Sequence, residues 1–248
     1  MQHLLAWSAL INNAAEVDVA PVPDPVITVQ NAHFLPQQDV RLNWACVMSA
    51  TLSRARFATP KTRQVTNPWI RPINVAVTPA SNPPMAWWVD SPFVFRALEE
   101  IQLLATSAVA MGTERFTGLA SINVGFQPIP QGDIYPLRFT STTAATANAW
   151  TQLTVTWQDT LPQGTYAIVG LEVFSANAQA ARLILQGQQY RPGAVSITAL
   201  ANRQNFIFVE RKVGVLGQFV QTAMPIVEVL ANAADASHEG YLQIIRIG

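Results

Sequence analysis

The stretch GTYAIVGLEVFSANAQAARLILQGQQYRPG, residues 164–193, decides the fold because part of it repeats an earlier segment. The segments MSATLSRARF (48–57) and FSANAQAARL (174–183) align without a gap. They share the pairs Ser49/Ser175, Ala50/Ala176, Ala55/Ala181 and Arg56/Arg182, and the pair Val47/Val173 extends the match by one residue. A repeat over this distance predicts that one fold occurs twice in the chain.

Both copies contain a segment with the pattern of a buried strand. Tyr166 to Phe174 is apolar on both faces, which is typical of a central strand that is covered on both sides. The earlier segment alternates, and its predicted inward face carries Val40, Leu42, Trp44, Cys46 and Met48. In the alignment Glu172 falls opposite Cys46, on this inward face, where an unpaired carboxylate is costly. Either Glu172 meets an arginine at a subunit interface, or the repeat is chance.

The remaining pattern predicts an all-β chain. The proline-rich segment QPIPQGDIYP (127–136) is the expected boundary between two halves. Each half has room for about eight short strands, which is the number in a jelly roll. We predict two tandem jelly-roll-like β-sandwiches, at 26–130 and 131–248, with an N-terminal segment at 1–25 before them. The alternative is a single jelly roll with long insertions.

The N-terminal segment is predicted to be a short helix followed by an extended arm. The apolar residues with helical spacing are Leu4, Leu5, Ile11 and Ala15, with Trp7 beside the stripe. Three prolines between positions 21 and 25 then favour an extended chain. A short apolar helix on such a tether docks on a neighbouring subunit, on a lipid surface or back on its own sandwich, and the sequence leaves all three open.

The composition indicates a chain that is covered by other molecules. Charged residues make up only 12% of the chain and apolar residues 50%, whereas a monomer of this size normally carries more surface charge. Arginine far outnumbers lysine, as it does at protein interfaces, although a genome that favours arginine codons has the same effect. The net charge of zero argues against a specific nucleic acid as the partner.

The sequence offers no residues in a catalytic or metal-binding pattern. His3, His33 and His238 have no partners at the spacing of a metal site or a catalytic triad. Cys46 is the single cysteine, which excludes an internal disulfide. No apolar run reaches the length of about 18 residues that a transmembrane helix needs. We therefore expect no enzyme activity, no cofactor and no metal.

Two further groups of residues are candidates for contacts with a partner. Trp87 and Trp88 lie close to Asp90, and we expect them to serve the core and an interface rather than a sugar-binding platform. The segment SRARFATPKTR (53–63) gathers basic residues on one edge, for which we expect salt bridges to carboxylates of a neighbouring subunit. The expected interface residues are Leu4, Leu5, Trp7, Ile11, Arg54, Arg56, Arg63, Trp87, Trp88 and Glu172.

An apolar N-terminal arm, two successive β-sandwiches, low charge and an excess of arginine together resemble the major capsid protein of double jelly-roll icosahedral viruses, the tailless and often membrane-containing phages. The resemblance is one of layout over about residues 26–248. It implies trimeric capsomers in an icosahedral shell, assembly in the host cytoplasm and residence in the virion. The implied partners are other copies of the chain, other capsid proteins and an internal membrane that the N-terminal arm contacts.

Other functions stay open at this point. The two halves are compact for jelly rolls, which keeps a single jelly-roll coat protein or a minor capsid protein as alternatives. A carbohydrate-binding or glycan-cleaving β-sandwich would use Trp87 and Trp88 with a carboxylate such as Asp90. A spike or tail adhesin module of a phage would share the same composition and be needed in few copies per particle.

Overall fold

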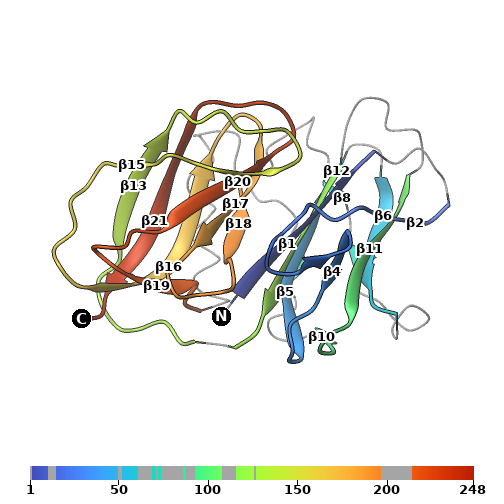
Figure 1. The fold of residues 1–248 in the computed structure, drawn as a ribbon, viewed down its shortest axis with the longest axis horizontal. Helices are drawn as coiled ribbons and strands as arrows, with labels where there is room; N and C mark the ends of the chain where they lie inside the picture. The colour runs from blue at the N-terminus through green and yellow to red at the C-terminus, as the bar shows by residue number, and fades with distance from the viewer. Residues whose placement is uncertain are drawn as a thin grey trace. The chain divides into compact units, whose positions relative to one another are not determined.

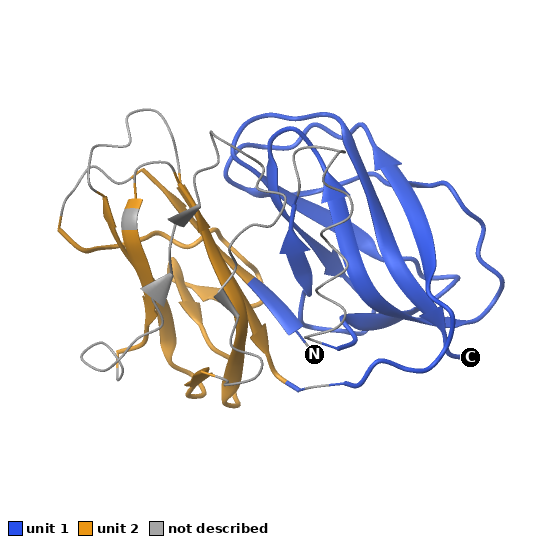
Figure 2. Ribbon diagram, turned by 180° about the vertical axis from the view of Figure 1, so that it is seen from behind, with its two compact units in different colours: residues 1–4, 125–248 blue, residues 5–124 orange. Residues whose placement is uncertain are grey.

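The structure is a computed structural model, which describes residues 2–10, 15–49, 52–60, 69–70, 72–73, 86–87, 93–107, 116–125, 127–196 and 214–248 (Figure 1). The chain forms two compact units. Unit 1 contains Met1–Leu4 and Gly125–Gly248, and unit 2 contains Leu5–Val124 (Figure 2). Within the described residues every regular element is a β-strand, so the predicted all-β class is confirmed.

Unit 2 contains the strands of the first half of the chain. They are β1 (Gln2–Ala9, whose first residues belong to unit 1), β2 (Val17–Asp18), β3 (Thr28–Val29), β4 (Ala32–Phe34), β5 (Val40–Met48), β6 (Leu52–Ala58), β7 (Trp69–Ile70), β8 (Pro72–Ile73), β9 (Ala86–Trp87), β10 (Phe93–Phe95), β11 (Glu100–Ser107) and β12 (Phe116–Asn123). One sheet has the order β1-β12-β5-β10, and the other has the order β3-β4-β11-β6-β7. The short strands β8 and β9 pair with β5, and β2 pairs with β11.

Unit 1 contains the strands of the second half. They are β13 (Tyr135–Ser141), β14 (Trp150–Gln152), β15 (Thr156–Trp157), β16 (Thr165–Phe174), β17 (Ala178–Ile184), β18 (Gly193–Val195), β19 (Gly217–Val220), β20 (Ile226–Ala231) and β21 (His238–Arg246). One sheet has the order β15-β13-β21-β16-β19, and the other has the order β14-β20-β17-β18.

The strand order in each unit is that of a jelly roll. In this fold one sheet carries the first, eighth, third and sixth strands, and the facing sheet carries the second, seventh, fourth and fifth. The orders β13-β21-β16-β19 and β14-β20-β17-β18 follow this pattern in unit 1. The orders β1-β12-β5-β10 and β4-β11-β6-β7 follow it in unit 2. The chain therefore holds two jelly rolls, and the alternative of one roll with insertions is wrong.

The repeated segments occupy equivalent places in the two rolls, where the chain crosses from the third strand to the fourth. β5 and β6 make this crossing between the two sheets in unit 2, and β16 and β17 make it in unit 1. The pairing of β5 with β12 skips Asn43, and the pairing of β16 with β21 skips Val169, the residue aligned with Asn43. Likewise the pairing of β6 with β11 skips Ser53, and the pairing of β17 with β20 skips the aligned Gln179. Both β-bulges therefore recur without a gap in the alignment.

The shared serines also have the same role. The Ser49 hydroxyl accepts a hydrogen bond from the backbone N–H of Leu52 at 3.1 Å, and the Ser175 hydroxyl accepts one from Ala178 at 3.3 Å. Each serine thus satisfies the backbone at the turn between the two sheets, a local bond that serine forms readily in turns. The sequence match therefore reflects a common structure of the connection between the two sheets.

The bulge at Asn43 corrects the predicted inward face of β5. Because one residue is added at the bulge, the alternation of side chains changes face there. Val40 and Leu42 belong to the core cluster of unit 2, but so do Ala45 and Val47, while Trp44, Cys46 and Met48 do not. The same shift at Val169 puts Glu172 on the strand face opposite Leu171 and Val173, where its register partner is Tyr241. The objection that Glu172 would lie inside the sandwich is thereby removed.

The predicted N-terminal helix is wrong, because this segment is strand β1. Its residues from Gln2 to Trp7 are all buried, so the apolar pattern has no period of two, and a strand covered on both faces cannot be told from a helix by periodicity. The proline-rich segment that follows packs on its own sandwich, with the N–H of Val19 bonded to the Leu103 carbonyl and that of Val22 to Ala6. Of the three docking sites left open by the sequence, the structure shows this one for the arm.

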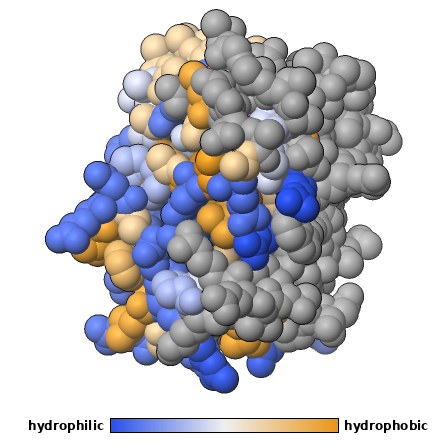
Figure 3. All heavy atoms as spheres, turned by 90° about the vertical axis from the view of Figure 1, so that its right-hand side faces the viewer, coloured by the Kyte–Doolittle hydropathy of each residue, from blue (hydrophilic) through white to orange (hydrophobic). Residues whose placement is uncertain are grey.

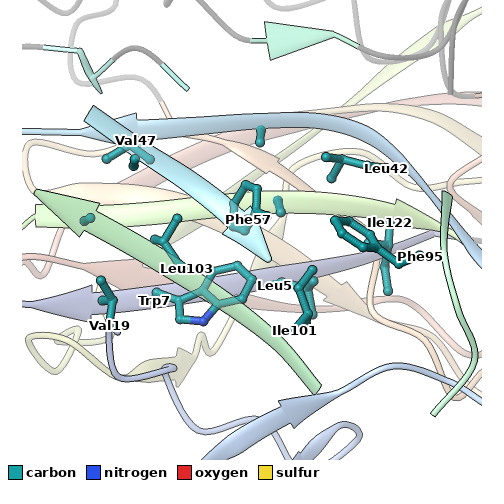
Figure 4. Close-up of a cluster of buried hydrophobic side chains, with 14 of the residues drawn as sticks. Leu5, Trp7, Val19, Leu42, Val47, Phe57, Phe95, Ile101, Leu103 and Ile122 are labelled. Carbon is teal, nitrogen blue, oxygen red and sulfur yellow. The ribbon is translucent and has the colours of Figure 1, made fainter. Parts of the chain in front are cut away.

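The core of unit 2 lies between its two sheets and includes this N-terminal strand. Figure 4 shows Trp7 and Leu5 among side chains from both sheets, with Phe57 next to Trp7. The Trp7 and Phe57 ring centroids are 5.1 Å apart, and the His33 ring meets Trp7 edge-on at 5.1 Å. Since Trp7 is 1% exposed, its side chain is part of the core of the roll.

Replacement of Trp7 tests this placement. Trp7→Ala should lower the free energy of unfolding by about 3–5 kcal/mol, because it leaves a cavity in the core. The matched control is Leu10→Ala just after the same strand, where the side chain is 41% exposed and the expected change is within about 0.5 kcal/mol. Urea unfolding measures both, and equal losses for the two variants would contradict the assignment of β1 to the core.

Candidate assembly surface

The expected N-terminal interface residues lie inside the protein. Leu4 and Leu5 are fully buried, and Trp7 is nearly so. The backbone N–H of Leu4 bonds to the Arg191 carbonyl within unit 1. These side chains are therefore covered by the chain itself rather than presented to a neighbour or to lipid. Ile11 lies outside the described residues.

The basic edge of β6 is only partly described. Arg54 is exposed, and Arg63 lies outside the described residues. Arg56 forms a two-point salt bridge with Glu16 of its own chain, with Nε–Oε2 at 2.9 Å and Nη2–Oε1 at 2.5 Å. The expectation of a neighbouring subunit's carboxylate is thus wrong for Arg56, because the segment after β1 brings Glu16 to it.

The tryptophan pair and Glu172 have different outcomes. The backbone of Trp87 pairs with that of Trp44, but the side chain of Trp87 and all of Trp88 lie outside what the structure describes. Asp90 lies outside it as well. Glu172 is 6% exposed within this single chain. A role for these residues at an interface stays a prediction.

Arg182, the counterpart of Arg56, lies in a buried charge cluster that sequence reasoning missed. Its Nε donates to Glu228 Oε2 at 2.7 Å, and Arg191 Nη1 donates to the same oxygen at 2.9 Å. The Arg182 guanidinium also lies 3.9 Å from the centre of the Trp150 ring. Arg56 and Arg182 therefore occupy equivalent strands and pair with a glutamate of the same chain in each unit. Two guanidinium groups thus share one carboxylate oxygen, and this contact holds Arg182 in its buried position in unit 1.

Removal of the shared carboxylate tests this cluster. Glu228→Ala should destabilise the protein by about 3–5 kcal/mol, since it leaves the buried Arg182 without its counter-charge. The matched control is Glu239→Ala, which removes a salt bridge at 3.1 Å whose Arg138 side chain is 45% exposed, and should cost about 0–1 kcal/mol. Urea unfolding at neutral pH gives both values. A loss below about 1 kcal/mol for Glu228→Ala would show that the cluster is solvated.

Asp235 ties the third-to-fourth-strand turn of unit 1 to the loop before β21. Its carboxylate accepts hydrogen bonds from the Ser175 hydroxyl, from the N–H of Asn177 at 2.9 Å and from the N–H of Ser237 at 3.1 Å. Burial alone would raise the pKa of Asp235, but these hydrogen bonds and nearby His238 outweigh it and lower the pKa below its ordinary value. The carboxylate is therefore held in its charged form by the fold.

This shift predicts a pH-dependent contribution to stability. Because the pKa of Asp235 is lower in the folded chain than in the unfolded one, its contribution is present at neutral pH and lost as the pH falls through the folded pKa. Asp235→Asn should therefore be less stable than the wild type near neutral pH, and the difference should shrink at about pH 3. Urea unfolding at both pH values measures it, and a difference independent of pH would refute the role of the charge.

The groups that usually carry chemistry are buried and bonded to backbone. His33 contacts the Ala6 carbonyl, His238 contacts the Thr143 carbonyl, and His3 accepts the N–H of Arg191. Burial raises the pKa of the Cys46 thiol to about 12. Within the described residues no three side chains of His, Cys, Asp or Glu gather as metal ligands. The same residues contain no helix that is long and apolar enough to cross a membrane.

One end of the larger sheet of unit 1 carries a groove with exposed apolar residues around it. β13 and β16 begin at this end and β21 and β19 finish there, as the pairs Tyr135–Ile244, Tyr166–Arg246 and Thr165–Val220 show (Figure 1). The groove has a volume of about 410 Å³, and its mostly apolar lining includes Tyr135, Leu137, Asp159, Leu161, Pro162 and Arg246. Exposed Ile134, Val220 and Ile247 lie at the same end of the sheet.

In unit 2 the turn between β10 and β11 presents an apolar side chain to solvent. Leu98 is 64% exposed and has a φ of 61°, a conformation that non-glycine residues adopt rarely. Its N–H bonds to the Pro36 carbonyl, and the N–H of Ala97 bonds to Asp39 Oδ1 at 3.0 Å. Arg96 Nη1 donates to Asp39 Oδ2 at 2.6 Å, and both side chains are well exposed. We call residues 96–98 the Leu98 turn.

Figure 3 shows the surface of the molecule from one side. Among its coloured atoms, hydrophobic and hydrophilic residues are interspersed. Exposed apolar side chains are scattered singly over most protein surfaces, so a local groove and a local projection are more informative than the total exposed area. The groove of unit 1 and the Leu98 turn of unit 2 are therefore the candidate assembly surfaces.

Comparison with known proteins adds a weak likeness in fold. No protein-family model matches this sequence, and no curated protein sequence matches it either. A solved structure, the crystal structure of the major capsid protein P2 from bacteriophage PM2, matches 100% of this chain and 98% of that chain, with 10% identity and a TM-score of 0.24. At this TM-score the superposition carries no argument about function, and the similarity is at most one of fold.

Proposed function

We propose that this protein is a structural viral coat protein, a major capsid protein that assembles into trimeric capsomers and an icosahedral shell. It acts in the virion after assembly in the host cytoplasm. It needs no cofactor and is not an enzyme, because its work is to form rigid walls. Its partners are other copies of the chain and other capsid proteins.

The observation that carries the proposal is the presence of two jelly rolls with the same strand order in one chain. Jelly rolls are common in viral capsids, where their rigid sandwiches serve as building blocks. Two similar rolls repeated by a threefold axis place six similar walls around that axis. A trimer of this chain therefore offers neighbours a nearly sixfold outline, which suits a closed shell.

The composition supports assembly as well. The chain has 12% charged residues and a net charge of zero, and proteins near zero net charge associate readily. Contact with an internal membrane, if the shell has one, has to use a surface other than Leu4, Leu5 and Trp7, because these side chains are buried. The membrane is therefore left out of the proposed partners.

No described feature favours the competing functions over this one. A glycan-binding or glycan-cleaving sandwich was expected to use Trp87, Trp88 and Asp90, whose side chains lie outside the described residues. A spike or tail adhesin module of a phage differs in being needed in few copies per particle, and no described feature points to that role. The coat role is therefore the function we favour.

Sedimentation tests the coat role directly. The purified wild-type protein should sediment as a trimer or a larger species at micromolar concentration, and negative-stain images should show particles, because the proposed work of the chain is assembly. Raising the salt concentration should not abolish contacts that are mostly apolar. A clean monomer at all salt concentrations, or binding to a glycan array without particles, would overturn the proposal.

A further inference from the structure

We propose that the Leu98 turn of unit 2 inserts into the groove of unit 1 on a second copy of this chain. The inference rests on the proposed coat function, because it names the contact through which copies associate. Each copy then donates one turn and accepts another, so every interface joins two different surfaces. Such a heterologous contact closes into a ring when the rotation between copies closes.

The two surfaces are compatible in size and polarity. The groove has a volume of about 410 Å³ and walls that include Leu137, Leu161 and Pro162, so it has room for an aliphatic side chain and its flanking turn. Leu98 is the most exposed of the large apolar side chains in the described residues, at 64%. Its transfer from water into an apolar groove is favourable because the hydrophobic effect scales with the apolar area that is removed from water.

The charges around the two surfaces are complementary. Exposed Asp159 and Arg246 lie at the groove, and exposed Arg96 and Asp39 flank the Leu98 turn. Arg96 and Asp39 pair with each other beside the turn, but Arg96 is 70% exposed and can be shared with a second carboxylate at the groove. In the orientation we propose, Arg96 lies beside Asp159. Discrete charged side chains beside an apolar projection favour a second copy of the chain as the occupant of the groove.

The backbone of the turn gives a second reason to assign it a role. A left-handed conformation is sterically unfavourable for leucine, a cost that glycine avoids and asparagine reduces at the same position. Two backbone N–H groups hold the turn in this shape. That of Leu98 donates to the Pro36 carbonyl, and that of Ala97 donates to the Asp39 side chain. Strain that is held in place at an exposed apolar side chain is typical of a binding position.

The first experiment replaces Leu98 without disturbing the turn. Leu98→Asn removes the apolar side chain and keeps a residue that tolerates positive φ, so the fold should be preserved. We expect the dissociation constant for self-association to rise by about 10- to 100-fold, measured by sedimentation equilibrium. The matched control, Leu10→Asn, changes another exposed leucine of the first half and should leave association unchanged. Equal effects of the two variants would overturn the proposal.

A mixing experiment then tests that the contact joins two different surfaces. Tyr135→Asp damages the groove at a residue that is 51% exposed, and Leu98→Asn damages the turn. Each variant alone should be monomeric, but an equal mixture should form a dimer, because one intact turn and one intact groove remain. A mixture that stays monomeric overturns the heterologous contact. Circular dichroism and thermal melting confirm that each variant is folded.

A double-mutant cycle tests the orientation. Arg96→Ala and Asp159→Ala should each weaken association by about 10-fold, and the double variant should be hardly weaker than either single variant, because the two groups act through one contact. If the effects of the two single variants add in the double variant, Arg96 does not face Asp159 and the proposal fails. If the wild type binds phospholipid vesicles or a glycan array and Tyr135→Asp abolishes this while sedimentation is unchanged, the groove has another occupant and the proposal is overturned.

The outcomes separate this inference from the coat function. A wild-type protein that is monomeric under all conditions refutes the coat function, and the inference falls with it. A wild-type protein that assembles, together with a Leu98→Asn variant that assembles equally well, refutes only the contact proposed here and leaves the coat function standing.

Discussion

Each roll depends on the connection by which the chain crosses from one sheet to the facing sheet. The crossing is made between Met48 and Leu52 in unit 2 and between Phe174 and Ala178 in unit 1. A strand on either side presents alternate residues to the interior, so a slip of one residue would expose a whole apolar face. The bulges before and after each crossing set this alternation, and the serine at each turn bonds to the backbone of the fourth strand.

The same scaffold carries different charge chemistry in the two units. Arg56 is partly exposed and pairs with Glu16 from the segment after β1, whereas Arg182 is fully buried with Glu228, Arg191 and the Trp150 ring. The backbone positions are equivalent, but only unit 1 has removed the arginine from water. Two rolls that have the same connection between their sheets but differ in their surfaces can present two different contact sites. A heterologous assembly requires two such sites.

The class of the fold and the repeat were readable in the sequence, because strand length, proline-rich boundaries and shared residues are local signals. Strand β1 could not be recognised from the sequence, since a strand covered on both faces shows no period of two. The face of Trp44 and Cys46 was misjudged because nothing in the residues around Asn43 announces a bulge. The pair Arg182 and Glu228 depends on the register between two strands far apart in the sequence, and the groove depends on four strand ends that meet only in the folded sheet.

The low charge of the chain acquires a structural meaning from these contacts. Arg56, which was expected to meet a carboxylate of a neighbouring subunit, is already paired within its own chain, and so are Arg138 and Arg182. Internal pairing leaves fewer charges to keep copies apart at a net charge of zero. Under the proposed coat function, copies of the chain have to associate through defined contacts, since a weakly charged surface without such contacts would aggregate. In the contact that we propose, the strained Leu98 turn and the groove of unit 1 would supply that specificity.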